Sequence, residues 1–434
     1  MARILLITYF FPPVNTVGCR RIYSWAKYLT EAGHDVTVVT ADTPDVRDAQ
    51  DFCMEESFLK VYRLAYFDAR NLIRKIARKK SSPSISAQKS LGSACIEKGT
   101  AVVNRLSERG ILLGFTRFPS FSEPWFTHAY KKVEHIIKEK GVDVIISSSP
   151  PPTVVRIAAA IKKRHPDIFW IADFRDLWTQ HANYRGMFPF SAWENQAEKN
   201  ALKKADVIIT VSEILKKTLE KKFAHKKISV IENGFDFESD VTSHKTDVER
   251  IMYFGTLYRT RHDITSLLQA AEELTKRGEA GKIQIEFYGS SITECIVKEQ
   301  LAHHPAAAKI VKYKGLLSFT SVLEKYKQAS ALLFIENDEK NDGVLTGKIF
   351  EYMAARKPIF CIGVDRGSYV GEFLYKTGVC FFCGRDVNRI KDFMLKLQKN
   401  EIIINPNEDF IAQFSHKKQV EKVNKIITSQ LSLS

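Results

Sequence analysis

The fold is decided by residues 3–40, which read RILLITYFFPPVNTVGCRRIYSWAKYLTEAGHDVTVVT. Arg3–Thr8 is an apolar run of strand length, and a loop with two prolines follows it. Apolar residues between Ile22 and Leu29 then recur at helical spacing, and the helix is expected to end at Gly33. Val36–Thr40 is the next strand. The stretch therefore predicts one β-α-β unit, the building block of a parallel sheet covered by helices.

The same alternation of strands and helices continues along the chain. Further strands are predicted at Val142–Ser147, Ile168–Ala172, Val207–Val211 and Ile228–Ile231. After a polar stretch a second series is predicted at Arg250–Phe254, Ile283–Tyr288, Ile310–Lys314, Ala331–Ile335, Pro358–Ile362 and Val379–Phe382. We therefore expect an α/β protein of two doubly wound, Rossmann-like domains, residues 1–235 and 236–414.

The composition is that of an ordinary globular protein, with 434 residues, 44% apolar and 26% charged. No run of 18 apolar residues occurs, so no transmembrane helix is expected, and the N-terminus lacks the features of a secretory signal. Seven scattered cysteines favour a reducing, cytoplasmic compartment. Cys380 and Cys383 have no second pair of ligands nearby, so no metal site is predicted.

Positive charge is concentrated in the first half of the chain. Lys and Arg outnumber Asp and Glu by 37 to 24 in residues 1–235, but only by 28 to 26 in residues 236–434. This asymmetry favours an anionic partner for the N-terminal domain, with solubility alone as the alternative. Nucleic acid is disfavoured because no zinc-finger spacing, RNP-like motif or basic zipper is present.

Residues 71–110 interrupt the alternation and contain no clear strand. Basic residues gather at Arg70–Lys80, where Leu72, Ile73 and Ile76 would form the apolar side of a short helix. Such a basic amphipathic segment predicts contact with an anionic membrane surface. A solvated insertion without a partner is the alternative.

The loop after the first strand is a candidate anion site. Gly18 would let the backbone approach a ligand closely, and Arg20 and Arg21 open the following helix. Neither G-x-G-x-x-G nor G-x-x-x-x-G-K-[ST] occurs, which disfavours plain dinucleotide binding and P-loop chemistry.

A second candidate site follows the predicted strand at Ile168–Ala172. Asp173, Arg175 and Asp176 place two carboxylates and a guanidinium at the carboxyl end of that strand, the edge that faces ligands in open α/β sheets. A cluster that only fixes its own loop is the alternative.

Two further segments suit a diphosphate. Gly255 follows a strand and precedes Arg259 and Arg261, whose guanidinium groups bind phosphate in a bidentate manner. Thr346, Gly347 and Lys348 stand where a helix should begin, with free backbone N–H groups. Glu351 lies one turn further on, where a carboxylate would accept hydrogen bonds from sugar hydroxyls.

Taken together, these features resemble the retaining glycosyltransferases of family 4, which have the GT-B architecture, and most closely a bacterial branch of that family. The resemblance spans nearly the whole chain except about residues 45–120. It is carried by Phe11-Pro12-Pro13, Ser148-Ser149-Pro150-Pro151, Asp173–Trp178, Ala205–Ser212, Asn233-Gly234 and Thr346–Tyr352.

The resemblance implies a nucleotide-diphospho-sugar donor on the C-terminal domain and a saccharide or lipid-linked acceptor on the N-terminal domain. Gly255, Arg259 or Arg261, and Lys348 would face the diphosphate, together with the Thr346-Gly347 helix start, and Glu351 would face the ribose. Gly18 would approach the donor phosphate from the other domain, and a final helix within 415–434 would return to the N-terminal domain. No cofactor or metal is implied, because cationic side chains and helix dipoles neutralise the phosphates.

Two positions leave the chemistry open. The wider family has a glutamate eight residues before Glu351, where this chain has Gly343, so sugar recognition would rest on backbone groups or on Asp342. The acceptor-side catalytic set would be Asp173, Arg175 and Asp176, with His181 nearby and no general base assigned. The expected activity is synthesis of a surface polysaccharide or glycoconjugate; a nucleotide-sugar 2-epimerase and a non-catalytic sugar-nucleotide-binding partner are the alternatives.

Overall fold

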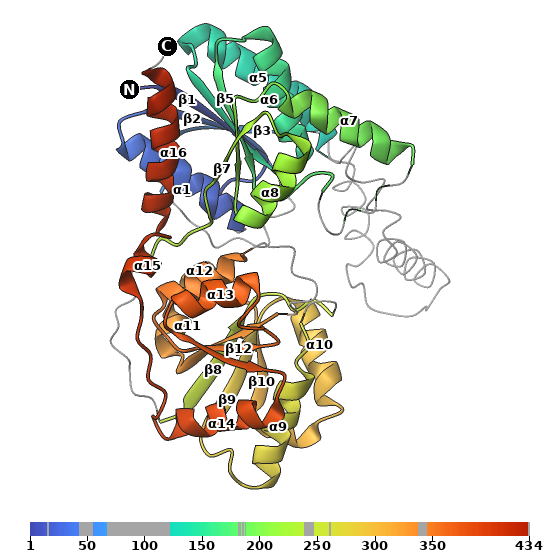
Figure 1. Ribbon diagram of the computed structural model, residues 1–434, viewed down its shortest axis with the longest axis vertical. Coiled ribbons are helices and arrows are strands. Elements are labelled where there is room, and N and C mark those ends of the chain that lie inside the picture. Colours follow the sequence, from blue (N-terminus) through green and yellow to red (C-terminus); the bar gives the residue numbers. More distant parts are fainter. Residues whose placement is uncertain are drawn as a thin grey trace, which may run out of the picture. The chain divides into compact units, whose positions relative to one another are not determined.

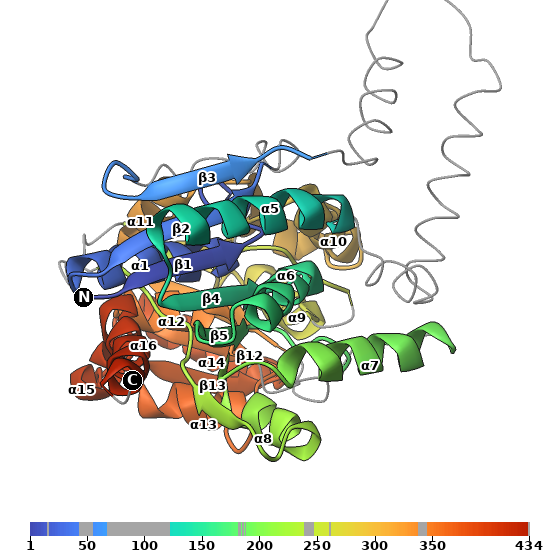
Figure 2. The same ribbon diagram turned by 90° about the horizontal axis from the view of Figure 1, so that it is seen from above.

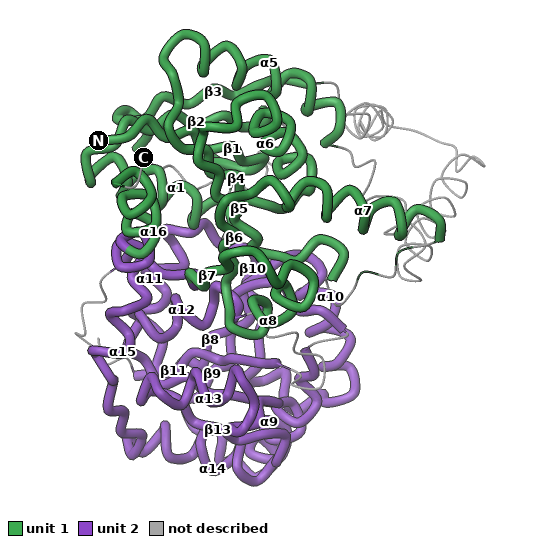
Figure 3. The backbone as a smooth tube through the Cα atoms, turned by 45° about the horizontal axis from the view of Figure 1, so that its top comes forward, with its two compact units in different colours: residues 1–231, 422–434 green, residues 232–421 purple. Residues whose placement is uncertain are grey.

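The computed structural model describes residues 1–14, 17–42, 55–66, 122–180, 184, 186, 188–237, 247–259, 262–336 and 345–432. The chain divides into two compact units, residues 1–231 with 422–434 (unit 1) and residues 232–421 (unit 2; Figure 3). The predicted patch at Arg70–Lys80 and the segment 71–110 lie outside the described residues, as do Arg261, Asp342, Gly343 and His181.

Unit 1 is built on a seven-stranded sheet in the order β3-β2-β1-β4-β5-β6-β7, and all of its strand pairs are parallel. Its elements are β1 (Arg3–Thr8), α1 (Val17–Glu31), β2 (Asp35–Ala41), β3 (Lys60–Leu64), α5 (Glu123–Lys140), β4 (Val144–Ser149), α6 (Pro152–Arg164), β5 (Phe169–Phe174), α7 (Phe190–Leu202), β6 (Val207–Thr210), α8 (Glu213–Lys222) and β7 (Lys227–Val230).

Helices cover both faces of this sheet. In Figure 1, α1 lies on one face, and α5, α6 and α7 lie on the other. The central strands β4 and β5 are buried along their whole length, as expected for parallel strands covered on both sides. Both strands run two residues further than predicted, so Ser148 and Asp173 belong to the strands themselves.

The strand β3 is absent from the sequence prediction. It lies at the edge of the sheet and is only partly buried, so its five residues KVYRL show no run of apolar side chains. An edge strand with one solvated side gives a weak sequence signal.

Unit 2 is built on a six-stranded parallel sheet in the order β10-β9-β8-β11-β12-β13. These six strands match the six that the sequence predicts. Its elements are β8 (Glu249–Phe254), α9 (Thr265–Lys276), β9 (Ile283–Tyr288), α10 (Ser291–Leu301), the 3-10 helix η2 (Pro305–Lys309), β10 (Val311–Gly315), α11 (Phe319–Gln328), β11 (Ala331–Ile335), α12 (Gly347–Ala354), β12 (Ile359–Ile362), α13 (Tyr369–Lys376), β13 (Cys380–Gly384), α14 (Val387–Gln398) and α15 (Glu408–Ala412).

The last helix, α16 (His416–Leu431), returns the chain to unit 1. Its first residues belong to unit 2, where the backbone N–H of His416 donates to the carbonyl of Phe235 at 2.8 Å. Its residues from Lys422 onward belong to unit 1, where Asn424 Oδ1 lies 2.8 Å from His34 Nε2. The expected return of the final helix to the N-terminal domain is thus confirmed.

The strand order reverses once in each sheet. In unit 1 the reversal falls between β1 and β4, and in unit 2 between β8 and β11. Ligands of doubly wound sheets bind beyond the carboxyl ends of the strands at such reversals. The segments after these four strands are therefore where the candidate site must be sought.

Candidate functional site

Gly255 follows β8 at the strand reversal of unit 2. Its φ of 116° is one that residues with a side chain rarely adopt, and a Cβ there would lie 2.6 Å from Cε of Lys348. Both backbone groups of Gly255 are bonded. The N–H of Gly255 donates to the carbonyl of Tyr288, and the carbonyl of Gly255 accepts from the hydroxyl of Thr293. Glycine is required here by both the backbone angle and the nearby ammonium group.

Lys348, in the first turn of α12, is the cation that lies against Gly255. Its Nζ donates to the hydroxyl of Tyr253 at 2.7 Å and lies 4.1 Å from the centre of that ring. Burial lowers the pKa of Lys348 to about 8, although the neighbouring carboxylates of Glu336 and Glu351 oppose this shift. Burial also raises the pKa of Tyr253, which keeps the phenol neutral and able to accept the bond.

The start of α12 offers further groups for an anion. Thr346 is its N-cap residue, with extended backbone angles, but its side chain makes no capping hydrogen bond. Its hydroxyl oxygen is buried without a hydrogen-bond partner among the residues that the structure describes. The first amides of a helix lack partners within the helix and carry the positive end of its dipole. Thr346, Gly347 and Lys348 therefore form one electropositive corner.

Glu351 lies one turn beyond Lys348 and is half-buried. Its Oε2 accepts a hydrogen bond of 2.8 Å from the hydroxyl of Tyr326, which fixes the carboxylate in place. A fixed carboxylate beside the electropositive corner is well placed to accept hydrogen bonds from the hydroxyls of a ribose. The structure thus brings Gly255, Lys348 and Glu351 to one edge of the sheet.

Arg259 has its ion-pair partner outside this corner, on α10. It is exposed and forms an ion pair with Glu299 of α10, which raises the pKa of its guanidinium. Contact with a diphosphate would require Arg259 to exchange this partner.

A substitution at Gly255 tests the corner directly. Gly255→Ala is expected to weaken nucleotide binding at least tenfold, because the new methyl group displaces Lys348 and the backbone angle costs about 1–2 kcal/mol. Gly278→Ala is the matched control: Gly278 also has a positive φ, of 73°, but a Cβ there would meet nothing within 4 Å. Isothermal titration of both variants with a nucleoside diphosphate measures the effect; equal affinities would refute the role of Gly255.

In unit 1, Gly18 lies against the guanidinium of Arg175. A Cβ on Gly18 would overlap Nη1 of that side chain. Arg175 is held there by Ser148 Oγ, 3.1 Å from its Nε, and more weakly by the carbonyl of Pro150. Burial lowers the pKa of Arg175, an effect that Asp173 and Asp176 oppose. The glycine that we expected to approach a phosphate thus also makes room for an arginine.

Asp173 is fully buried at the end of β5. Its Oδ1 accepts from Nη2 of Arg21 at 2.9 Å, and its Oδ2 accepts from Ser148 Oγ at 2.7 Å. Arg21 is itself buried and donates to the carbonyl of Ile231 at 2.9 Å. These contacts favour a positioning role for Asp173 over direct contact with a substrate. Asp176, in contrast, is only half-buried.

Sequence reasoning missed the partners that hold these groups. Arg21 was noted only as a cation near the loop, although it precedes Trp25 by four residues and so shares the buried face of α1. A buried arginine requires a buried acceptor, but the sequence does not show that this acceptor is Asp173. Tyr253 and Tyr326 gave no signal, because only the folded chain shows which side chain their hydroxyl groups reach.

The described residues contain neither a metal-binding cluster nor a membrane-spanning helix. No group of three or more His, Cys, Asp or Glu side chains there is arranged to hold a metal ion. Among the same residues, no helix is long and apolar enough to cross a bilayer.

Comparison with known proteins adds to this geometry. The family model described as Glycosyltransferase Family 4 matches residues 20–239, just over half of the chain. No curated protein matches the chain.

Solved structures with the same GT-B fold are distant in sequence. Sucrose-phosphate synthase from Thermosynechococcus elongatus is 13% identical, with a TM-score of 0.62 and 100% of both chains covered. HepE from Anabaena, in complex with UDP, is 10% identical, with a TM-score of 0.58, 98% of this chain and 100% of that chain covered. A putative UDP-N-acetylglucosamine 2-epimerase from Listeria monocytogenes is 11% identical, with a TM-score of 0.55, 100% of this chain and 98% of that chain covered.

These likenesses agree with the fold, and the family match covers most of unit 1. The expected family is confirmed: the chain belongs to Glycosyltransferase Family 4.

Proposed function

We propose that this protein is a retaining glycosyltransferase that moves a sugar from a nucleotide-diphospho-sugar to a saccharide or lipid-linked acceptor. The observation that carries the proposal is the position of Lys348, a partly buried cation at the start of α12, beside the strand reversal of unit 2. An anion is the ligand that such a corner stabilises best.

In this proposal the donor binds unit 2. Lys348, the N–H groups at the start of α12 and the Gly255 loop hold the diphosphate, and Glu351 accepts hydrogen bonds from the ribose. Arg259 binds the same phosphates once it is released from Glu299, and we propose Arg261, which lies outside the described residues, as a second guanidinium for them. We propose a metal-independent reaction, because Lys348 and the dipole of α12 supply positive charge where the leaving diphosphate gains negative charge.

The acceptor binds unit 1 in this proposal. Arg175 and the half-buried Asp176 contact the acceptor, and Asp173 positions Arg175 through Ser148, since both bond its hydroxyl. A leaving phosphate oxygen takes the proton from the acceptor hydroxyl, so no protein nucleophile is needed. Gly18 leaves the space that the guanidinium of Arg175 occupies.

We further propose that the product is a surface polysaccharide or glycoconjugate made on the cytoplasmic side of a membrane. The excess of 37 basic over 24 acidic residues in residues 1–235 suits an anionic, lipid-linked acceptor or an anionic lipid surface. The cationic stretch Arg70–Lys80 remains a candidate for that contact.

A thermal-shift panel of UDP, GDP, ADP and CMP, with and without magnesium, tests the donor site, followed by the sugar nucleotides of the base that binds. UDP comes first, because the HepE structure is a complex with UDP. A metal-independent rise in Tm with one base supports the proposal, and a flat response to all bases contradicts it.

One observation favours the alternative function of a nucleotide-sugar 2-epimerase: the putative Listeria epimerase has the same fold. An epimerase would convert its sugar nucleotide without an acceptor, whereas a transferase would release the nucleotide only when an acceptor or water takes the sugar. A non-catalytic partner would bind the nucleotide and do neither. Chromatography of a UDP-sugar incubated with the protein separates these outcomes.

Nucleotide affinity is expected to depend on pH through Lys348. Below about pH 8 the side chain is cationic and attracts the diphosphate, and as the pH rises through 8 it loses its proton and its attraction. Titration with the bound nucleotide should therefore show affinity falling above about pH 8. The Lys348→Arg variant stays charged and should remain flat over the same range; the same decline in both proteins would exclude Lys348 as the cause.

A further inference from the structure

Glu351, the residue that faces the ribose in the proposed function, is held by a side chain from another helix. Tyr326 belongs to the last turn of α11, and its hydroxyl donates to Oε2 of the Glu351 carboxylate at 2.8 Å. Tyr326 is 3% exposed, whereas Glu351 is only half-buried. The carboxylate is thus partly open to solvent, and the phenol that bonds it lies in the core.

Aromatic rings hold Tyr326 from several directions. Its ring packs edge-to-face against Phe254 of β8 and Tyr352 of α12, with ring centroids 5.0 and 5.8 Å apart. It also packs against Phe237, at 5.9 Å. Edge-to-face contacts have a specific geometry, and a close-packed interior leaves such a ring little freedom. The phenol oxygen therefore has one defined position, and its hydrogen bond gives Glu351 a defined direction.

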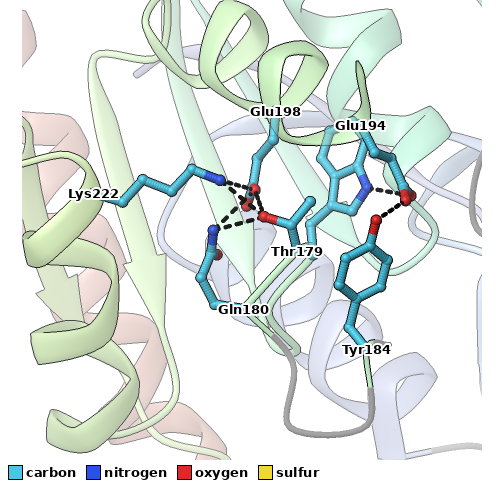
Figure 4. A network of polar contacts seen from close by, with 7 residues as sticks. Thr179, Gln180, Tyr184, Glu194, Glu198 and Lys222 are labelled. Carbon is cyan, nitrogen blue, oxygen red and sulfur yellow. Dashed lines mark hydrogen bonds and ion pairs between the residues drawn. The ribbon is translucent and has the colours of Figure 1, made fainter. Parts of the chain in front are cut away.

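Two other bonds from a phenol to a carboxylate show how a purely structural pair differs. In unit 1, Tyr184 donates to Glu194, which also accepts from the indole N–H of Trp178 (Figure 4). Glu194 stands on α7, the helix seen side-on in Figure 2. In unit 2, Tyr288 donates to Glu286 at 2.7 Å. Glu194 and Glu286 are only 1% and 4% exposed, so their bonds serve the core, whereas a carboxylate held in the same way but partly exposed is placed for a donor from outside the chain.

The ribose of a nucleotide offers two neighbouring hydroxyls as donors. A carboxylate has about four lone-pair positions, so Glu351 can accept from Tyr326 and also from a ribose. Because Tyr326 already orders the Glu351 side chain, less rotamer freedom is lost when the sugar binds. A 2′-deoxyribose lacks one of the two donors, and the bond from that donor to the charged carboxylate is then not made.

We propose that Tyr326 is a positioning residue that sets the preference of the donor site for ribose over 2′-deoxyribose. Tyr326 acts through Glu351, because it is itself buried. The donor is then a sugar attached to a ribonucleoside diphosphate, and sugars attached to deoxythymidine diphosphate are poor donors. The inference rests on the proposed function, in which Glu351 faces the ribose, and adds the residue that gives this carboxylate its selectivity.

Isothermal titration of the full-length protein tests the proposal with UDP, GDP, ADP and CDP, each beside its 2′-deoxy counterpart. The unmodified protein should bind the ribose form of its nucleotide about tenfold more tightly than the deoxy form, since one hydrogen bond to a charged group is lost. Tyr326→Phe keeps the ring and its packing but removes the donor. We expect the ratio to fall to about threefold or less, mainly because the ribose form binds more weakly.

Tyr288→Phe is the matched control. It removes a phenol–carboxylate bond from the same unit, its ring stacks on Phe254 as the ring of Tyr326 also contacts it, and its backbone carbonyl is unchanged. It should keep the ratio of the unmodified protein. Glu351→Gln should lower the ratio by itself, and Tyr326→Phe added to it should change the ratio no further, because the phenol acts through this carboxylate.

Three results would each overturn the proposal: an unchanged ratio in Tyr326→Phe, an equal fall in Tyr288→Phe, or a further fall in the double variant. Failure of the proposed function looks different. If no nucleotide binds, the donor site itself is refuted and the role of Tyr326 with it. If a nucleotide binds with an affinity that depends on Lys348 but not on the 2′-hydroxyl, the donor site stands and only the role of Tyr326 is refuted.

Discussion

Lys348→Met is expected to abolish turnover and to weaken nucleoside diphosphate binding by about tenfold to a hundredfold. The variant keeps an apolar stem of similar length but removes the charge-assisted contact with the diphosphate, which contributes about 1.5–3 kcal/mol to binding. Loss of a cation that faces developing phosphate charge lowers kcat by a further factor of about 10²–10³. Isothermal titration and product release assays measure the two effects.

Lys357→Met provides the control for this experiment. Lys357 lies in the same unit and its pKa is also lowered by burial, but it follows α12 at the opposite end from Lys348. Its loss should change stability without changing nucleotide affinity. A Lys348→Met variant that binds nucleotide and turns over like the Lys357 variant would remove the basis of the proposed donor site.

Arg21→Met is expected to have the largest effect on stability. The pair of Arg21 and Asp173 is almost completely buried, with side-chain exposures of 1% and 0%. Removing Arg21 takes away the ion-pair partner of this buried carboxylate, which costs about 3–5 kcal/mol. All five tryptophans belong to unit 1, so their fluorescence during urea denaturation reports the unfolding of that unit.

Two further variants sharpen this measurement. Arg156→Met breaks a partly exposed pair with Glu123 in the same unit and should cost less than about 1 kcal/mol. The double variant Arg21→Met, Asp173→Leu should recover much of the lost stability, because an apolar pair replaces a charged one. A cost for Arg21→Met no greater than that for Arg156→Met would show that the buried pair contributes little.

Much of the fold could be predicted because parallel strands covered on both sides consist of apolar runs. All six strands of unit 2 and the central strands of unit 1 were located in this way. β3 was missed because one side of an edge strand is solvated. The ends of β4 and β5 were placed two residues too early, since Ser148, Ser149 and Asp173 are polar yet buried.

The candidate donor-site residues of unit 2 were predicted more completely than the candidate acceptor-site residues of unit 1. Gly255, Lys348 and Glu351 could be proposed from their positions after a strand or at a helix start, where the local chain geometry already favours an anion. The acceptor side depends on contacts such as Arg21 with Asp173, which are 152 residues apart in the chain. No local pattern predicts which buried charges meet at that distance.

The amino-acid pattern was therefore enough to predict the two α/β sheets, apart from β3, and the segments that carry the candidate site. These features follow from local periodicity, which acts over a few neighbouring residues. The burial of Asp173, the contact of Arg175 with Gly18 and the bond from Lys348 to Tyr253 became visible only in the folded chain. Such contacts depend on how distant segments pack, because burial and pairing of a charge are properties of its surroundings in space.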